Sequence, residues 1–245
     1  MRLKEVRRFV RLLILESEGT LGYKMIFLAG LPGGGKSTLL RQLGIEDKFA
    51  NCNIDNFFEP ALEKELGTKD LHTPTDRYTK LKKRMEREGY QPTEEELVQF
   101  EKDKDLVSRG ASLFSGAIKQ FKDQVEEVCQ IGSNFIIDGT SANYRRTVEE
   151  LDKYTAMGYD CAMIMVDIDI ETSQARNISR GQKGERAIYG GIIWRQGQSM
   201  EGNQTLYKDL FGPDRFFLVS NRGTFEEYKE KIELIRPGVQ AFMEA

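Results

Sequence analysis

The stretch 26-IFLAGLPGGGKSTLL-40 decides the fold class of this chain. An apolar run leads into a glycine-rich turn, and a lysine, a serine and a threonine follow it. Gly30 to Ser37 match the pattern GxxxxGK[ST], in which glycines let successive backbone N–H groups point at phosphate oxygens. The helix that follows would add the positive end of its dipole. The alternative is an ordinary glycine-rich turn that carries a solvated lysine.

The residues around this motif favour phosphate binding. The segment before it is strand-like and the segment after it is helical, which is the context that the motif requires. The sequence therefore predicts an NTP site with Mg²⁺. Lys36 would reach the β and γ phosphates, and the Ser37 hydroxyl would bind the metal. The residues predicted to line the nucleotide site are Gly30, Gly33, Gly34, Gly35, Lys36, Ser37 and Thr38.

Composition argues against several other kinds of site. The chain has 245 residues, 31% of them charged, and a net charge of −3, which suits one α/β domain and argues against a protein that coats DNA. Its three cysteines form no CxxC pair, which argues against disulfides and zinc and favours a reduced, cytoplasmic setting. The single histidine, His72, is expected in a surface loop, so histidine metal sites and Ser-His-Asp triads are not expected.

Strand-like runs alternate with helical patterns along the chain. Strands are predicted at 25–30, 51–54, 134–138, 161–168 and 215–220. This alternation predicts a parallel sheet of about five strands with helices on both faces, the three-layer fold of P-loop NTPases. Helices are predicted at 37–43, from Thr93, at 144–157, and from Thr224 to a point before Pro237. Residues 59–130 show no clear strand and are predicted to be a helical insertion with a turn at 89–92, within a P-loop domain at 23–245.

The N-terminal residues 1–22 combine basic residues with an apolar run of only four residues. That run is too short for a signal-peptide core or a membrane span, so no transmembrane segment is predicted. The spacing of the apolar residues predicts a basic amphipathic helix. It would pack on the domain or on a protein partner; the alternative is an anchor to a membrane surface or to nucleic acid.

Two carboxylates follow predicted strands near the phosphate-binding motif. Asp138 ends the third strand, where it can support Mg²⁺ through water; alternatively it caps the next helix. Asp55 follows the second strand, where phosphoryl transfer needs a base for the acceptor hydroxyl. Alternatively, Asp55 bonds its own backbone in a turn, and its spacing does not separate these two interpretations.

Arginines and glycines alternate in segment 171–196. This pattern predicts a mobile lid that closes over the triphosphate and meets the charge that develops during transfer. The alternative is a basic, solvated helix and loop. The arginines of the segment are Arg176, Arg180, Arg186 and Arg195. No NKxD motif for GTP is present to support a switch, although the sequence does not separate ATP from GTP as the substrate.

These features, in this order, resemble the zeta-toxin group of P-loop kinases, which also includes polynucleotide kinases and phage DNA-base kinases. The matching stretches, within a resemblance that covers roughly 24–222, are GLPGGGKST at 30–38, IDNF at 54–57, FIIDGT at 135–140 and ISRGQKGERA at 178–187. The resemblance implies that Asp55 is the base and that Arg180 and Arg186 contact the phosphates. Asp138 stands where zeta toxins tend to have Glu, at a position that contributes to acceptor binding in that family.

The resemblance implies a kinase that uses ATP (or GTP) and Mg²⁺ to phosphorylate a hydroxyl of a nucleotide sugar or a similar small molecule. The long insertion and the basic N-terminal helix leave open a nucleic-acid acceptor, either a hydroxymethylated DNA base or a 5′-hydroxyl end. A non-catalytic nucleotide-binding module is a third alternative. Candidates for the acceptor site, just past the third strand, are Asn143, Tyr144, Arg145 and Arg146.

Overall fold

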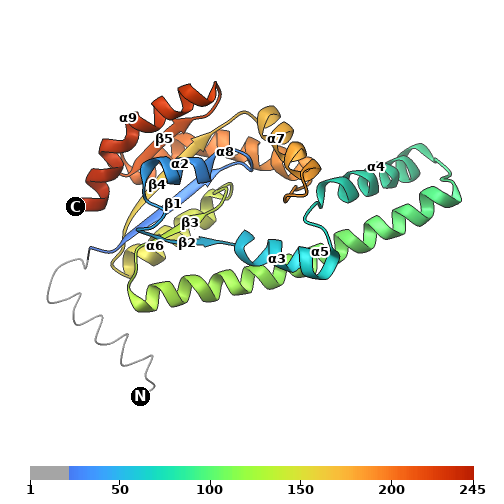
Figure 1. The fold of residues 1–245 in the computed structure, drawn as a ribbon, viewed down its shortest axis with the longest axis horizontal. Coiled ribbons are helices and arrows are strands. Elements are labelled where there is room, and N and C mark those ends of the chain that lie inside the picture. Colours follow the sequence, from blue (N-terminus) through green and yellow to red (C-terminus); the bar gives the residue numbers. More distant parts are fainter. Residues whose placement is uncertain (1–21) are drawn as a thin grey trace, which may run out of the picture.

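The computed structural model describes residues 22–245, and the predicted N-terminal helix falls almost entirely outside them. A five-stranded parallel sheet forms the centre of the molecule (Figure 1). Its strands are β1 (Lys24–Gly30), β2 (Ala50–Asn53), β3 (Phe135–Asp138), β4 (Asp160–Asp167) and β5 (Phe216–Ser220). They lie in the order β2-β3-β1-β4-β5. The predicted fold class and all five predicted strands are therefore confirmed.

Helices cover both faces of this sheet, and β1 is consequently buried along its whole length. Successive side chains of a strand point to opposite faces, so Met25 and Phe27 join one hydrophobic core while Ile26 and Leu28 join the other. The first core is closed by α5 (Glu94–Ile131), α6 (Tyr144–Ala156) and α8 (Gly190–Phe211). The second is closed by α2 (Lys36–Leu43) and α9 (Phe225–Glu244).

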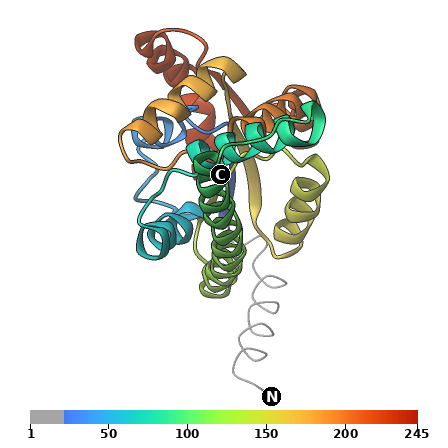
Figure 2. The same cartoon turned by 90° about the vertical axis from the view of Figure 1, so that its right-hand side faces the viewer.

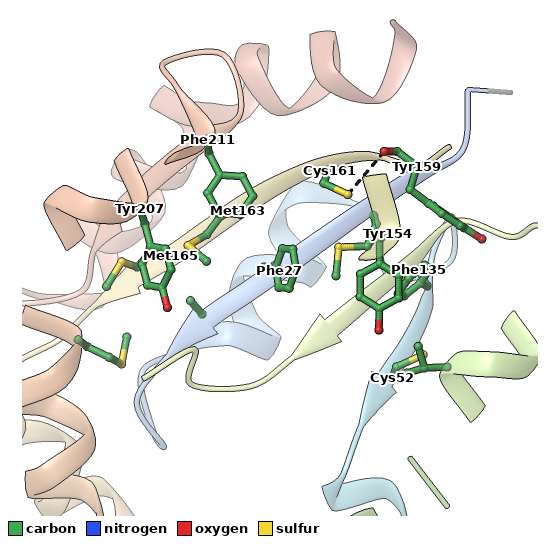
Figure 3. Packing of buried hydrophobic residues seen from close by; sticks show 14 of the residues in the cluster. Phe27, Cys52, Phe135, Tyr154, Tyr159, Cys161, Met163, Met165, Tyr207 and Phe211 are labelled. Atoms are coloured by element: carbon green, nitrogen blue, oxygen red, sulfur yellow. Dashed lines mark hydrogen bonds between the residues drawn. The ribbon is translucent and has the colours of Figure 1, made fainter. Parts of the chain in front are cut away.

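Aromatic rings and sulfur atoms fill the first core (Figure 3). The ring of Phe135 meets those of Tyr154 and Tyr159 edge to face, with centroids 5.3 and 5.1 Å apart. Aromatic pairs favour this geometry. The three cysteines of the chain are buried thiols of this core. Burial raises the pKa of Cys52 and of Cys161 to about 12, so these thiols stay protonated and unreactive near neutral pH.

The predicted insertion is helical and forms an arm. It consists of α3 (Asp55–Leu66), α4 (His72–Glu88) and the 38-residue helix α5, so it begins and ends slightly outside 59–130. Figure 1 shows α4 and the first half of α5 standing away from the sheet, and Figure 2 views this arm end-on. The predicted turn lies between α4 and α5, where Gly89 ends one helix and Thr93 begins the next with a capping box.

An ion pair with a buried carboxylate and a half-exposed arginine joins the two long helices of the arm. The carboxylate of Asp103 on α5 is 1% exposed and accepts hydrogen bonds from Arg77 on α4, at 2.7 and 2.9 Å. Gln99 donates a further bond at 2.9 Å. The outer surface of both helices is charged.

No helix within residues 22–245 is both long enough and apolar enough to cross a bilayer.

The prediction that the last helix ends before Pro237 is wrong. α9 continues through this proline to Glu244. A proline inside a helix removes one backbone hydrogen bond. Here the turns beyond it bury Val239 and Phe242 in the second core, and Arg236 donates to the carbonyl of Gln42 at 2.6 Å. Packing against the sheet and α2 therefore outweighs the lost bond.

His72 also departs from its expected position in a surface loop. It is the first residue of α4 and is half-buried. Its Nδ1 atom is buried, with no hydrogen-bond partner among the described residues. The connection between α3 and α4 is short, and the carboxylate of Asp70 accepts a hydrogen bond from the backbone N–H of His72 at 2.8 Å. This local bond helps α4 to begin at His72, so the histidine belongs to a helix and not to a loop.

Candidate active site

The glycine-rich motif forms the loop between β1 and α2, at the carboxyl edge of the sheet, where parallel α/β sheets bind ligands. Gly33 and Gly35 have φ values of 72° and 94°, in the left-handed region that favours glycine. A Cβ atom on Gly35 would lie 2.8 Å from Nδ2 of Asn221 and 3.0 Å from the ring of Tyr228. The loop therefore follows a backbone path that a side chain at Gly35 would block.

The loop and the start of α2 fit the phosphates of a nucleotide. Within residues 22–245 no side chain caps the first turn of α2, and no acidic residue lies in that turn. The N–H groups of a helix N-terminus and its dipole then favour an anion. Ser37 is exposed on this first turn, so its hydroxyl is accessible to a metal ion.

The residues present also fit Mg²⁺ bound together with a nucleotide. The described part of the chain holds no cluster of three or more His, Cys, Asp or Glu residues placed to bind a metal ion by themselves. Mg²⁺ usually needs no such cluster, because it keeps several waters and takes one or two protein oxygens plus phosphate oxygens. Ser37 would supply a protein oxygen directly, and Asp138 would support the ion through one of its waters.

Lys36 and Asp138 meet beside the loop. The ammonium of Lys36 donates to the carbonyl of Gly30 at 2.9 Å, and it lies 3.7 Å from the Asp138 carboxylate. The register of β2 and β3 places Asn53 opposite Asp138, and the Asn53 amide donates to this carboxylate at 3.0 Å. Asn143, not Asp138, caps the following helix. The geometry thus favours the interpretation that Asp138 belongs to the phosphate site.

The environment of Asp138 raises its pKa above the ordinary value. Burial is the main cause: the side chain is only 7% exposed, which penalises the charged form. The nearby ammonium of Lys36 opposes this shift, and the negative charge of Asp55 adds to it. A carboxylate at this position therefore costs stability in the unligated protein, which indicates a role beyond folding.

We expect the stability of the Asp138→Asn variant, relative to wild type, to increase as the pH rises. With a raised folded-state pKa, the folded chain binds more protons than the unfolded chain between about pH 3.9 and that raised value. The stability present below this window is lost as the pH rises through it, and the variant lacks this loss. Thermal unfolding at several pH values checks this, and a difference in Tm that does not vary with pH would contradict it.

Asp55 lies in the first turn of α3, directly after β2, and forms an ion pair with Arg186. The backbone N–H of Asp55 donates to Oδ1 of Asn53 at 2.8 Å, so Asn53 makes the local turn bond. Asp55 does not need to serve as the turn residue. The Arg186 guanidinium also lies over the Phe58 ring, 5.3 Å from its centroid. Two predicted site residues from distant parts of the chain therefore meet next to the Lys36–Asp138 pair.

The segment predicted as a lid consists of α7 (Ile170–Gln182), a loop, and the start of α8. Its loop is anchored at two adjacent residues. Ala187 makes two backbone hydrogen bonds with the residues before α4. Its carbonyl accepts from the N–H of Leu71 at 3.1 Å, and its N–H donates to the carbonyl of Lys69 at 3.4 Å. Ile188 is held by both ends of the Asn177 amide, at 2.8 and 2.9 Å. These bonds fix the loop to the arm and to α7, and Arg186 next to them pairs with Asp55.

The other predicted arginines are not brought to the same place. Arg180 forms an ion pair with Glu185 at 3.0 Å, and both side chains are at least 40% exposed. Arg195 is exposed on α8. Arg176 instead donates to the carbonyl of Gly33 at 3.0 Å, so it is the α7 arginine that contacts the phosphate loop. The predicted phosphate contact of Arg180 stays a prediction.

Three further side chains contact the phosphate loop and were not predicted as site residues: Ser173, Asn221 and Tyr228. Only Ser173 had a visible signal, since it lies one turn before Arg176 in the segment predicted as a lid. The acceptor role of Asn143, Tyr144, Arg145 and Arg146 stays a prediction. The Tyr144 ring packs 5.3 Å from that of Tyr207 on α8, and the other three make contacts within α6. Asn143 caps α6, while Arg145 and Arg146 pair with glutamates one turn along the same helix.

Comparison with known proteins identifies the family. Residues 25–191 match the family described as an AAA domain, and this match spans more than half of the chain. The chain therefore belongs to this AAA-domain family. A search of curated proteins finds no match.

Solved structures share the fold. A candidate kinase from Chloroflexus aurantiacus has a TM-score of 0.51 at 15% identity, covering 91% of this chain and 99% of that one. A structure from the PezAT chromosomal toxin–antitoxin system of Streptococcus pneumoniae has a TM-score of 0.53 at 14% identity, with 100% of both chains covered. The shared fold agrees with the resemblance to zeta-toxin-like P-loop kinases.

Proposed function

We propose that the protein is an ATP-dependent kinase that transfers the γ-phosphate to a hydroxyl group of an acceptor. The observation that carries this proposal is the ion pair of Asp55 and Arg186 beside Lys36 and Asp138. A passive nucleotide binder needs the phosphate loop and its lysine. It does not need a second carboxylate that a distant arginine meets at the same edge of the sheet.

The phosphate loop and Lys36 would bind the triphosphate. The N–H groups of the loop and of the first turn of α2 can donate to phosphate oxygens, and Lys36 adds a positive charge on the β and γ phosphates. Mg²⁺, held by Ser37 and supported by Asp138, would neutralise further charge on these phosphates. Catalysis of phosphoryl transfer depends mainly on such positioning and charge stabilisation.

Asp55 would act on the acceptor. The acceptor oxygen attacks the γ-phosphorus, the bond from that phosphorus to the β–γ bridging oxygen breaks, and ADP leaves. The hydroxyl proton passes to the Asp55 carboxylate, whose Oδ2 accepts a hydrogen bond from Arg186, so Oδ1 would take the proton. Arg186 supplies a fixed positive charge next to this step. This charge would also stabilise the negative charge on the transferred phosphoryl group.

The proposed acceptor is a nucleotide sugar or a similar small molecule. The net charge of −3 supports a small acceptor over nucleic acid, whose phosphates attract basic surfaces. The PezAT structure comes from a toxin–antitoxin system, and a protein partner bound through residues 1–22 of this chain stays a prediction. The role of Arg180 as a second phosphate-binding arginine also belongs to the proposal.

Transfer of labelled γ-phosphate from ATP tests the proposal. The acceptors to compare are UDP-N-acetylglucosamine, DNA with a 5′-hydroxyl end and DNA that contains hydroxymethyluracil, each with Mg²⁺. We expect label on the nucleotide sugar or on a related small molecule. Label on either DNA would move the acceptor to nucleic acid. ATP binding without label on a broad set of small hydroxyl compounds and DNA would mean a non-catalytic binding module.

A further inference from the structure

We infer that four side chains from outside the phosphate loop are positioning residues, which hold its carbonyl groups outward and so aim its N–H groups at phosphate. These four loop donors are Ser173, Arg176, Asn221 and Tyr228. The inference rests on the proposed function only in requiring that the loop binds the phosphates of a nucleotide.

Two of the loop donors come from one face of α7. The Ser173 hydroxyl donates to the carbonyl of Pro32 at 2.7 Å, and the Arg176 guanidinium donates to the carbonyl of Gly33 at 3.0 Å. Residues three apart on a helix lie on the same side, so both reach adjacent carbonyls of the loop. Ser173 is fully buried, which fixes its hydroxyl at this contact.

The other two loop donors come from the residue that follows β5 and from α9. The Asn221 amide donates to the carbonyl of Gly34 at 2.7 Å, and the Tyr228 hydroxyl donates to the carbonyl of Gly35 at 3.0 Å. Asn221 is only 5% exposed and Tyr228 only 2% exposed. The backbone of Asn221 is itself fixed to β4, since its N–H donates to the carbonyl of Asp167 at 2.7 Å.

The loop donors therefore bind four consecutive carbonyl groups, and the carbonyl of Gly35 also accepts from the backbone N–H of Leu39 at 3.0 Å. In a trans peptide the carbonyl of one residue and the N–H of the next lie in one plane and point in opposite directions. Holding the carbonyls of Pro32, Gly34 and Gly35 outward directs the N–H groups of Gly33, Gly35 and Lys36 the other way. The N–H of Gly34 is already used, because it donates to the carbonyl of Leu31 at 3.0 Å.

This arrangement offsets the flexibility of the glycines. A glycine-rich loop loses much conformational freedom when it becomes ordered. If the loop donors order it in the unligated protein, phosphate meets N–H groups that are already aligned, which increases affinity through preorganisation. A merely structural contact would instead change stability and leave nucleotide affinity unaltered.

Nucleotide binding by variants of two loop donors tests the inference. Tyr228→Phe removes only the hydroxyl donor, and Asn221→Asp replaces the donor with an acceptor of the same shape. The matched control is Tyr159→Phe, because Tyr159 is also buried and donates its hydroxyl to a backbone carbonyl, that of Ser133, at 3.2 Å. Calorimetry gives the Kd for ATP and, by competition, for adenosine, and thermal unfolding gives Tm.

We expect Tyr228→Phe to weaken ATP binding about three- to tenfold, as for the loss of one hydrogen bond, and Asn221→Asp to weaken it more. Adenosine affinity should stay at the wild-type value, because it has no phosphate. Tyr159→Phe should bind ATP like wild type whatever its Tm. If Asn221→Asp fails to fold, Tyr228→Phe decides alone.

ATP affinity within twofold of wild type in Tyr228→Phe would overturn the inference, as would an equal loss of adenosine affinity. A wild-type protein that binds no ATP would overturn it together with the proposed function. ATP binding that responds to the loop donors, in a protein that transfers no phosphate, would uphold the inference and refute only the proposed kinase activity.

Discussion

Replacing Asp55 with Asn should lower phosphoryl transfer by about 10²- to 10⁴-fold, the usual contribution of a positioned general base. The amide cannot take the proton of the acceptor hydroxyl. Its oxygen can still accept a hydrogen bond from Arg186, so the local fold should persist. ATP affinity should stay near the wild-type value, because Lys36 and the phosphate loop are untouched. Single-turnover transfer and calorimetric ATP binding measure the two quantities separately.

Asp160→Asn is a matched control for this variant. Asp160 pairs with an arginine, Arg215, at 3.0 Å, and its side chain is 29% exposed, against 34% for Asp55. It lies at the amino end of β4, on the opposite edge of the sheet from the phosphate loop. Asp160→Asn should therefore transfer phosphate at the wild-type rate per folded molecule. Equal transfer by Asp55→Asn and wild type would show that Asp55 is not the base.

The parts of the fold that depend on residues close together in the sequence could be predicted from it. The capping boxes at Thr93 and Thr224 are local patterns, and both begin the helices expected of them. The apolar strands were also visible, since burial on both faces leaves few polar residues. The continuation of α9 past Pro237 was not, because it depends on contacts with β5 and α2 that no local pattern reports.

The same distinction holds for the site. The position of Lys36 was predictable from the glycine-rich motif. Asp55 and Asp138 were candidates because the carboxyl ends of neighbouring parallel strands meet at one edge of the sheet, and their roles stay predictions. The contacts of Asn221 and Tyr228 with the phosphate loop join residues 187 and 193 positions apart, and an Asn or Tyr in such a place carries no motif.

Arg180 and Arg186 look equivalent in the sequence, where both stand among glycines. They differ in the structure because hydrogen bonds fix Ala187 and Ile188, and Arg186, the preceding residue, therefore lies in the site. The anchoring partners are Lys69, Leu71 and Asn177, none of which belongs to a motif that would have shown the difference.

Replacing Lys36 with Ala should lower phosphoryl transfer by about 10³-fold or more, since a preorganised charge aimed at the transferred group is lost. ATP binding should weaken as well, which separates this variant from Asp55→Asn. The matched control is Lys24→Ala at the other end of β1, where a buried lysine pairs with Asp160 at 2.9 Å. That variant should lose stability and keep the wild-type transfer rate per folded molecule.

The change also removes the cation that opposes the raised pKa of Asp138, so this pKa should rise further in Lys36→Ala. A double-mutant cycle with Asp138→Asn separates the two consequences. If Lys36 acts on stability through Asp138, the double variant should recover the Tm that Lys36→Ala loses at neutral pH. It should not recover transfer, because the charge on the phosphates is still missing. Transfer restored together with Tm would mean that Lys36 serves only to neutralise Asp138 and that the reaction needs neither side chain.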